Sequence, residues 1–500
     1  MTGRPASKDI RPGDFALSVG MPDESAPPGW EWVALSDVAT MATGHTPSRK
    51  HPEYWSDASI RWVTATDANP ADGGVINETR QKINQLGLDN SAAVLLPEGT
   101  VCLSRTGASI GYTVILGQRM ATSQGFVNWI CSSGLEKWYL LYLLMSERRA
   151  LFSFGEGSAH ATIYFPVAKA FHICLPPYNE QRRIVAKLEE LFSDLDAGVA
   201  ALERAKANLK RYRAAVLKAA VEGKLTEEWR AENPDVEPAS ELLERILVER
   251  RERWEAEQLA KYEEKGKKPP KGWEEKYKEP AEPDVEGLPE LPEGWCWTSL
   301  GQCFDVRVGA TPSRKSASYW NGTIPWVSSG EVQFGRISST RETITAEGLQ
   351  NSSTRLNPAG SVLLGMIGEG KTRGQTAILE IPACNNQNCA AICVSMTPIL
   401  SEFVYYWLWS QYEVTRTRGS GNNQPALNKT RVERIPLPLP PVHEQESIVR
   451  TIEALLSNVE SSENLIRGGL KRSTRLRKSI LKRAFEGKLV PQDLNDEPAS

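Results

Sequence analysis

The sequence lacks several features that would assign a protein to a functional class at once. No run approaches the roughly 20 apolar residues of a membrane-spanning helix, and residues 1–27 mix Pro, Asp, Lys and Gly without the apolar core of a signal peptide. The net charge is only −3, so any anion-binding surface must come from local groups of Lys and Arg. We therefore expect a soluble, cytoplasmic protein that does not bind membranes.

The eight cysteines also lack the paired Cys-x-x-Cys spacing of structural zinc sites. The densest group, Cys384, Cys389 and Cys393, lies in an apolar stretch typical of a strand. We expect these thiols to be buried and reduced, and we expect no metal site in the chain.

What the sequence does contain is a long internal repeat. The segment Gly44, Thr46-Pro47-Ser48-Arg49-Lys50, Tyr54-Trp55 and Trp62-Val63 returns 265 positions later as Gly309, Thr311-Pro312-Ser313-Arg314-Lys315, Tyr319-Trp320 and Trp326-Val327. Further on, Pro176-Pro177 and Glu180-Gln181 return as Pro440-Pro441 and Glu444-Gln445. A period this long exceeds a solenoid repeat, so it predicts two similar domains related by pseudo-two-fold symmetry. Any function must need two related sites.

Each repeat begins with a compact mixed domain, in which short β-branched or aromatic runs alternate with Gly and Pro turns. In the first copy we expect strands at 60–66, 101–104, 127–131 and 171–175 and a helix at 137–149. In the second copy we expect strands at 361–365 and 390–394 and a helix at 402–412.

After each domain the apolar period changes from two to about three and a half, which indicates a coiled-coil seam. The first seam is formed by Leu188, Leu191, Leu195, Gly198, Leu202, Ala205, Leu209, Tyr212, Val216 and Ala219, and the second is interrupted by small or polar residues. A helix with one apolar stripe needs a partner. We therefore predict an α+β fold, in which two mixed domains are separated by long helices that pair as an antiparallel coiled coil, a rod of at most about 65 Å.

These repeated residues resemble the specificity subunit of type I restriction-modification enzymes, and the resemblance covers nearly the whole chain. Gly309-Ala310-Thr311-Pro312-Ser313, Tyr319-Trp320 and Ile324-Pro325-Trp326-Val327 look like the opening of a target recognition domain. From composition, periodicity and the repeat we expect a disordered tail at 1–27, target recognition domain 1 at 28–177, a central helical spacer region at 178–264, a Lys/Glu/Pro-rich linker at 265–290, target recognition domain 2 at 291–439, a C-terminal spacer helix at 440–490 and a tail at 491–500. The helix near 240–261 is either a solvated helix or a docking site for a partner subunit.

In that family each recognition domain reads one half of a bipartite double-stranded DNA target, and the helices set the gap between the halves. The resemblance implies partnership with two methyltransferase subunits that use S-adenosylmethionine to methylate adenine N6, and it leaves open two restriction subunits that use ATP and Mg. It implies no cofactor and no catalytic residue in this chain.

Two motifs suggest other chemistry. Gly365, Gly370, Lys371 and Thr372 satisfy the spacing of a phosphate-binding loop, but a strand-like segment follows where such a loop would open a helix. Leu175-Pro176-Pro177-Tyr178 is similar to the Asn-Pro-Pro-Tyr site of amino-methyltransferases, yet Leu cannot accept the hydrogen bonds of the target amino group, and the prolines are better explained as the end of a strand.

Forked or amide side chains read base edges, whereas Lys, Arg, Ser and Thr also hold phosphates. In the first domain the candidates are Thr46, Ser48, Arg49, Lys50, Arg105, Ser123, Gln124 and His160. In the second they are Thr311, Ser313, Arg314, Lys315, Lys371, Arg373, Asn385, Asn386, Gln387, Asn422, Asn423 and Gln424. Because both copies share Thr-Pro-Ser, we expect that motif to form a turn, cap a helix or bind phosphate; positions that differ between the copies are better candidates for base reading.

The leading hypothesis is thus a noncatalytic, sequence-specific DNA-binding subunit. The alternatives are a nucleotide-hydrolysing protein that uses Lys371 and a coiled-coil assembly scaffold without DNA specificity. The repeated aromatic residues Tyr54, Trp55, Trp62, Tyr319, Trp320 and Trp326 are expected in the core rather than stacked on bases.

Overall fold

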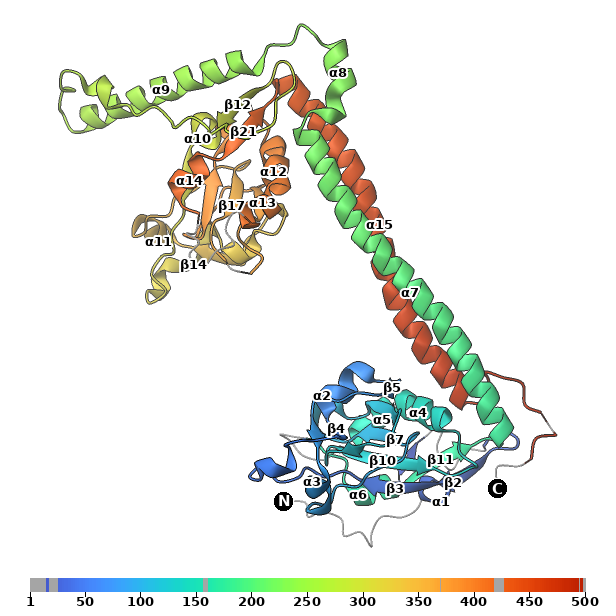
Figure 1. The fold of residues 1–500 in the computed structure, drawn as a ribbon. Helices are drawn as coiled ribbons and strands as arrows, with labels where there is room; N and C mark the ends of the chain where they lie inside the picture. The colour runs from blue at the N-terminus through green and yellow to red at the C-terminus, as the bar shows by residue number, and fades with distance from the viewer. Residues whose placement is uncertain are drawn as a thin grey trace. The chain divides into compact units, whose positions relative to one another are not determined.

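The computed structural model describes residues 15–17, 26–155, 161–368, 370–417, 427–493 and 495–497 (Figure 1). The chain divides into two compact units, Met1–Arg204 with Ile466–Ser500 and Ala205–Leu465. Each unit holds one mixed domain and one end of both long helices. The second unit therefore begins and ends inside a helix.

The first domain is built around a five-stranded sheet in the order β3-β10-β7-β8-β5. Its strands are Ala39–Thr43, Phe126–Cys131, Val101–Ser104, Thr113–Leu116 and Val75–Ile76. A smaller sheet, β6-β4-β9, joins Lys82–Ile83, Ile60–Val63 and Ala121–Thr122. The strand predicted at 60–66 stops at Val63, because the Thr64 backbone N–H donates to Asp67 at 3.0 Å and caps the short helix α2, Ala65–Ala68.

The second domain repeats this plan strand for strand. Its five-stranded sheet has the order β13-β20-β17-β18-β15, with the strands Val306–Val308, Cys389–Ile392, Val362–Gly365, Thr376–Leu379 and Gly335–Ile337. The smaller sheet, β16-β14-β19, joins Glu342–Ile344, Trp320–Val327 and Cys384–Asn385. The strand predicted at 390–394 ends at Ile392, after which a 3-10 turn, Val394–Met396, leads away from the sheet. The sequence repeat is thus a structural repeat.

Each domain packs one apolar helix on its sheet. The helix predicted at 137–149 is α4, Lys137–Ser146, followed by the separate helix α5, Arg148–Ser153. The helix predicted at 402–412 is α12, Ser401–Ser410, followed by α13, Tyr412–Thr417. Both predictions therefore placed the helix correctly and ran past its end.

A third sheet ties each domain to the start of a long helix. In the first unit, β11 (Phe171–Leu175) pairs with β2 (Glu31–Ala34), and in the second, β21 (Pro436–Leu439) pairs with β12 (Cys296–Ser299). The tail predicted to be disordered at 1–27 departs from that expectation, because Phe15–Leu17 forms β1 and pairs in parallel with β11. Backbone pairing to an open sheet edge is the physical reason for this order.

The long helices are α7, Tyr178–Val221, and α15, Val442–Phe485, and they pack against each other in antiparallel fashion within each unit. In the first unit Arg477 pairs with Asp196, and a Cβ added at Gly469 would lie 3.0 Å from Leu202. In the second unit Arg213 pairs with Glu463 at 3.0 Å. The small residues that interrupt the second seam therefore let the helices approach closely, and the predicted pairing is confirmed.

One continuous core joins each domain to both long helices. In the first unit buried residues of α4 share a cluster with Ile184 and Leu188 of α7 and with Leu481 and Phe485 of α15. In the second unit α12 shares a cluster with Leu217 of α7 and with Ile448 and Ile452 of α15. Because removing apolar area from water is the main stabilising term, each domain and its end of the helical pair fold as one body.

Between the repeats, α8 (Glu227–Glu232) leads to α9, Ala239–Glu264, which matches the helix predicted at 240–261. The linker predicted to be extended at 265–290 contains a turn, Trp273–Lys276, whose buried Trp273 stacks on Trp254 with ring centroids 5.9 Å apart.

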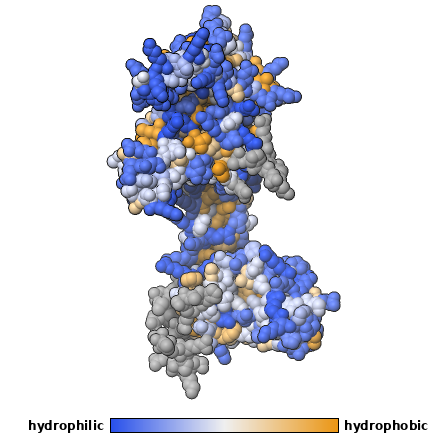
Figure 2. Space-filling model, turned by 90° about the vertical axis from the view of Figure 1, so that its left-hand side faces the viewer, coloured by the Kyte–Doolittle hydropathy of each residue, from blue (hydrophilic) through white to orange (hydrophobic). Residues whose placement is uncertain are grey.

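The face in Figure 2 is mostly hydrophilic, with hydrophobic residues in small groups. Within the described part of the chain, no helix combines the length and apolarity needed to cross a bilayer.

Candidate nucleic-acid interface

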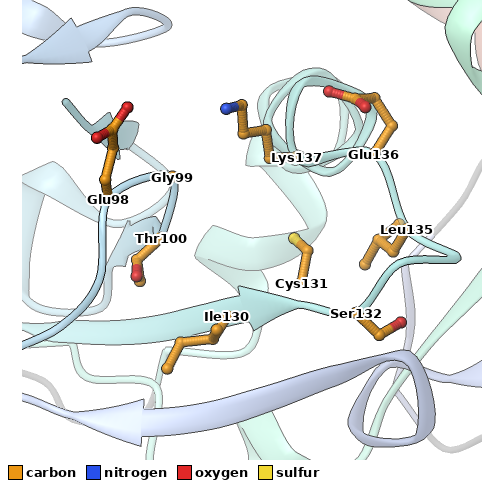
Figure 3. Close-up of a pocket in the computed structure, with 9 residues that line it drawn as sticks. All are labelled: Glu98, Gly99, Thr100, Ile130, Cys131, Ser132, Leu135, Glu136 and Lys137. Carbon is orange, nitrogen blue, oxygen red and sulfur yellow. The ribbon is translucent and has the colours of Figure 1, made fainter. Parts of the chain in front are cut away.

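The first domain carries a depression of about 320 Å³ that brings together none of the predicted site residues. Figure 3 shows Glu98 on one side of it and Glu136 and Lys137, at the start of α4, on the other. Cys131 also lines it, but burial raises the pKa of this thiol to about 12, so the thiolate needed for nucleophilic chemistry is scarce at neutral pH. The depression offers no catalytic set of side chains among the described residues.

The predicted site residues instead meet at a pair of equivalent loops. Thr46 Oγ1 donates a hydrogen bond to the Gln124 side chain, and Thr311 Oγ1 donates to Gln387 Oε1 at 2.6 Å. Gln124 and Gln387 follow the equivalent strands β9 and β19, so they are counterparts. Gln124 therefore belongs to the framework that the two domains share.

Within each domain, a glycine lets the Thr-Pro-Ser loop approach the segment that carries the bonded glutamine. A Cβ added at Gly44 would lie 2.1 Å from the Ser123 carbonyl oxygen, and one added at Gly309 would lie 2.0 Å from the Asn385 carbonyl oxygen. No side chain fits in either gap, which explains why glycine opens the motif in both copies.

Two indole rings hold each Thr-Pro-Ser-Arg loop from beneath. Trp55 Nε1 donates to the Ser48 carbonyl at 3.3 Å and Trp320 Nε1 to the Ser313 carbonyl at 3.2 Å. Trp62 and Trp326, only 3% and 2% exposed, donate to the carbonyls of His45 and Ala310 at 2.9 and 3.0 Å. Trp62 and Trp326 thus lie in the core, as predicted, whereas Trp55 and Trp320 are half-buried and support the loop through their hydrogen bonds.

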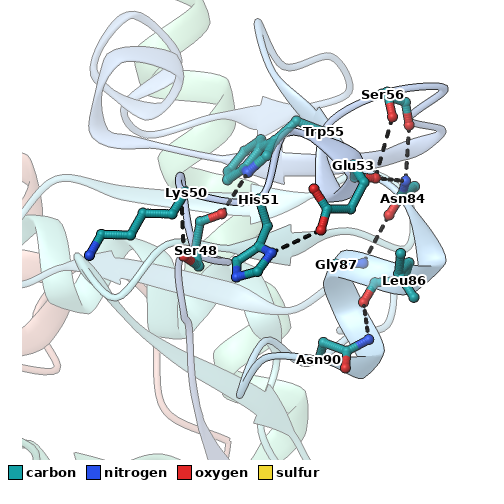
Figure 4. A network of polar contacts seen from close by, with 10 residues as sticks. All are labelled: Ser48, Lys50, His51, Glu53, Trp55, Ser56, Asn84, Leu86, Gly87 and Asn90. Carbon is teal, nitrogen blue, oxygen red and sulfur yellow. Dashed lines mark hydrogen bonds and ion pairs between the residues drawn. The ribbon is translucent and has the colours of Figure 1, made fainter.

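The chain after the first loop is fixed in the same way. Figure 4 shows Asn84 bonded to the carbonyls of Glu53 and Ser56, at 2.6 and 3.0 Å, while its side-chain oxygen accepts from the Gly87 N–H at 2.9 Å. Lys50 extends away from this network. Ser48, Lys50, Ser313 and Lys315 are exposed, so each loop presents hydroxyl and cationic groups on a rigid base.

The arginine of the motif lies flat on the same indole in both domains. The Arg49 guanidinium carbon is 3.6 Å from the centre of the Trp55 ring, and that of Arg314 is 3.7 Å from Trp320. Their polar partners differ. Arg49 donates to the neutral Gln81 at 2.5 Å, whereas Arg314 makes two hydrogen bonds to Glu342, one of 2.9 Å, and this pairing lowers the pKa of the Glu342 carboxyl.

Gln81 and Glu342 were absent from the predicted site. They follow Thr79-Arg80 and Thr340-Arg341, so aligning the two copies at this dipeptide would have identified them as counterparts that differ in charge.

Three predicted reading residues are buried and must be corrected to supports. Arg105 is 9% exposed and donates to the carbonyls of Gln124 and Ile163 at 2.8 and 2.9 Å. Asn385 is 1% exposed and donates to the carbonyls of Asn386 and Cys389. Asn386 is buried too, and its side-chain oxygen accepts from the Asn388 N–H. The Arg105 and Asn385 side chains donate to carbonyl groups of their own domain, so these donors are not offered to a base edge.

The remaining predicted residues are placed as follows. Ser123 is half-buried, and Lys371 is exposed on the turn after β17. Arg373 is half-buried and donates to the Arg416 carbonyl at 3.4 Å. The structure does not describe His160, Asn422, Asn423 and Gln424, which lie outside the described residues.

The segment that resembles a phosphate-binding loop joins β17 to β18, and these strands are antiparallel neighbours. Such a connection opens no helix behind the Gly-Lys-Thr sequence, so it lacks the helix N-terminus that cradles nucleotide phosphates. Leu175 ends β11 and α7 begins at Tyr178, so the Pro-Pro pair ends a strand as predicted.

Comparisons with known proteins agree with this architecture. The family described as "Type I restriction modification DNA specificity domain" matches residues 27–204 and 292–467. The type I restriction enzyme EcoDI specificity subunit of Escherichia coli is 24% identical over 486 residues, covering 94% of this chain and 91% of that protein. The MjaIX specificity subunit of Methanocaldococcus jannaschii is 22% identical, covering 88% and 90%.

Among solved structures, a chain from a study of complex assembly and conformational transition of the type I R-M system is similar with a TM-score of 0.61 at 20% identity, covering 93% of this chain and all of that one. The HsdS subunit from Thermoanaerobacter tengcongensis has a TM-score of 0.50 at 19% identity, covering 93% and 99%. Both likenesses concern the fold. Because the family description matches both domains and the adjoining helices, the chain belongs to the family of type I restriction-modification DNA specificity proteins.

Proposed function

We propose that this chain is the specificity subunit of a type I restriction-modification system, in which each domain reads one half of a bipartite target in double-stranded DNA. The observation that carries the proposal is the repetition of one rigid basic loop on two domains of identical strand order, each built into an end of the same pair of helices. Two equivalent loops suit what two half-sites share, which is the phosphate backbone.

Base reading then falls to exposed positions that differ between the domains. Exposed Lys371 is such a position, because it lies in a turn that has no counterpart motif in the first domain. Phosphate contacts position the protein and base-edge contacts specify the sequence, so the shared loops set how the duplex is held and the variable turns set which bases are accepted.

In this proposal the chain is noncatalytic and binds no cofactor itself. Two methyltransferase subunits would supply S-adenosylmethionine chemistry at adenine N6, and restriction subunits would supply ATP- and Mg-dependent cleavage. The chain's own part is to hold the duplex so that the target adenines face those partners.

The test is a binding selection. The chain is combined with its methyltransferase partner and incubated with random duplexes, and the bound fraction is sequenced. We expect one motif made of two short specified halves and a fixed unspecified gap. A single contiguous motif contradicts the proposal, and equal affinity for all duplexes favours the assembly scaffold. Nucleotide turnover by the purified chain that is lost on Lys371→Ala would favour the hydrolase, which the strand-to-strand turn at Lys371 argues against.

A further inference from the structure

Two arginines at equivalent positions of the long helices α7 and α15 connect this helical pair to the recognition domain, one arginine in each unit. We propose that Arg213 and Arg477 are positioning residues that fix the angle between each recognition domain and the helical pair, and that they thereby fix the gap length the protein accepts. This inference rests on the proposed function and assigns one of its properties to named side chains.

In the second unit, Arg213 of α7 bridges the other long helix and the recognition domain. Its Nη2 donates to Glu463 of α15 at 3.0 Å, and its guanidinium carbon is 5.7 Å from the centre of the Trp409 ring on α12. The side chains of Arg213 and Glu463 are only 26% and 28% exposed. One guanidinium thus contacts three elements, α7, α15 and α12.

In the first unit, Arg477 of α15 occupies the position 264 residues later, which is the displacement of the repeat. It pairs with Asp196 of α7, and its guanidinium carbon is 4.4 Å from the Phe192 ring. Phe192 in turn meets the edge of Tyr142 on α4, with ring centroids 5.7 Å apart. The contact to the domain is direct in the second unit and passes through one aromatic ring in the first.

The arginines lie next to the apolar cores that attach the domains. Arg213 precedes buried Leu217 by about one helical turn, and Arg477 precedes buried Leu481 in the same way. Apolar burial is non-directional and tolerates small rotations. A planar guanidinium held by a carboxylate and by a ring face tolerates rotation poorly, because both contacts depend on its orientation.

The angle matters because the reading loops lie on the domain and the domain is carried by the helices. A change of tilt at the helix would displace the loops along the duplex axis without altering their side chains. An exposed ion pair alone would have little effect. The Arg213 and Glu463 side chains are mostly covered, and Arg213 also lies near the Trp409 ring. Asp196 is 64% exposed, so Arg477 depends more on its contact with the Phe192 ring.

The experiment uses the complex of the chain with its methyltransferase partner and duplexes whose half-sites are constant while the gap varies by one or two base pairs. Arg213→Met and Arg477→Met keep the apolar stem of the side chain and remove the guanidinium. Arg211→Met is the matched control, since Arg211 is an exposed arginine of the same helix and donates to Asn208 of that helix.

For each positioning variant we measure the ratio of the binding constants for the best and the next-best gap. We expect this ratio to fall roughly threefold or more, with the bases of both half-sites unchanged. Arg213→Lys keeps the charge and loses the planar contact, so it should give a smaller loss of gap preference. This variant also keeps the test valid if Arg213→Met fails to fold. Unchanged gap preference in Arg213→Met and Arg213→Lys, or an equal loss in Arg211→Met, would overturn the inference. If the unaltered complex selects no bipartite motif, the proposed function fails instead.

Discussion

At the scale of residues, the two recognition domains each place an arginine over an equivalent tryptophan, but the polar partners of the two arginines differ. Arg314 is paired with the Glu342 carboxylate, whereas Arg49 meets the neutral amide of Gln81. A cation that neutralises a phosphate releases a counterion, and a cation already paired with a carboxylate releases less. In the proposed function, the two half-sites are held by loops of similar shape and unequal charge.

Substituting these partners should change how strongly DNA binding depends on salt concentration, in opposite directions for the two loops. Glu342→Gln frees Arg314 and should steepen the plot of log binding constant against log salt concentration by about one unit, while Gln81→Glu should flatten it by about one unit. Binding to a duplex with both half-sites, titrated across salt concentrations, measures this slope. Glu347→Gln, which removes an exposed acid from the short helix α11, Ala346–Gln350, without releasing an arginine, is the control. Equal slopes for all variants would mean that neither loop contacts phosphate.

The residues that could be predicted from sequence are those that the repeat displays. The Thr-Pro-Ser-Arg loops and their tryptophans were found because both copies retain them. Burial could not be predicted in the same way, because the local sequence does not distinguish Arg105, Asn385 and Asn386 from polar residues on exposed turns. Their burial follows from contacts with distant parts of the domain, such as the close approach of Gly309 to Asn385.

At the scale of elements, each long helix begins with a buried glutamate whose surroundings differ between the units. Glu444 accepts from Thr226 at 2.6 Å and from Trp295 at 2.8 Å, and it pairs with Arg230. Glu180, its counterpart, has a side-chain oxygen without a hydrogen-bond partner among the described residues. Burial raises the pKa of Glu180, although Trp30 and Arg183 act in the opposite direction.

The same substitution should therefore have opposite effects at the two helix starts. A folded-state pKa above the unfolded value means that ionised Glu180 costs stability at neutral pH, and that this cost disappears as the pH falls through about 4. Glu180→Gln should raise the Tm at pH 8 by a margin that shrinks on acidification. Glu444→Gln should lower the Tm, because Arg230 loses its charged partner. Thermal melts of both variants between about pH 4 and pH 8 provide the measurement, and destabilisation by Glu180→Gln at pH 8 would refute the argument.

The element boundaries also show what local sequence can and cannot predict. Strands 101–104 and 171–175 were predicted to the residue, since Gly or Pro bounds them. The helix predicted at 137–149 and the strand predicted at 60–66 ran too far, because α4 ends before the next helix begins and Thr64 caps α2. Such ends depend on hydrogen bonds that the hydrophobic pattern does not encode.

At the scale of the whole molecule, the repeat couples the two copies through their helices. Each recognition domain is built into a core that takes residues from the beginning of one long helix and the end of the other. Neither domain can complete its core from its own copy alone. The apolar seams in the sequence were sufficient to predict that the helices pair. That each core takes residues from the start of one helix and the end of the other becomes visible only in the packed structure.

The helical pair should act as a ruler, and its length should set the gap between half-sites. Four residues inserted in the 197–207 segment of α7, matched by four in the facing 466–476 segment of α15, add about one helical turn to both helices and keep the seam nearly in phase. The pair then lengthens by about 6 Å, which corresponds to roughly two base pairs of duplex.

Methylome sequencing of cells that carry the lengthened chain with its methyltransferase partner should reveal the same two half-sites separated by a longer gap, because the turns that we propose to read the bases are untouched. An insertion in α7 alone should also change the accepted gap, but with weaker methylation, since one helix of the pair then loses its register. Two outcomes would reject the ruler. An unchanged gap would show that the helices do not set the spacing, and new bases in either half-site would show that the helices and the reading loops are not independent.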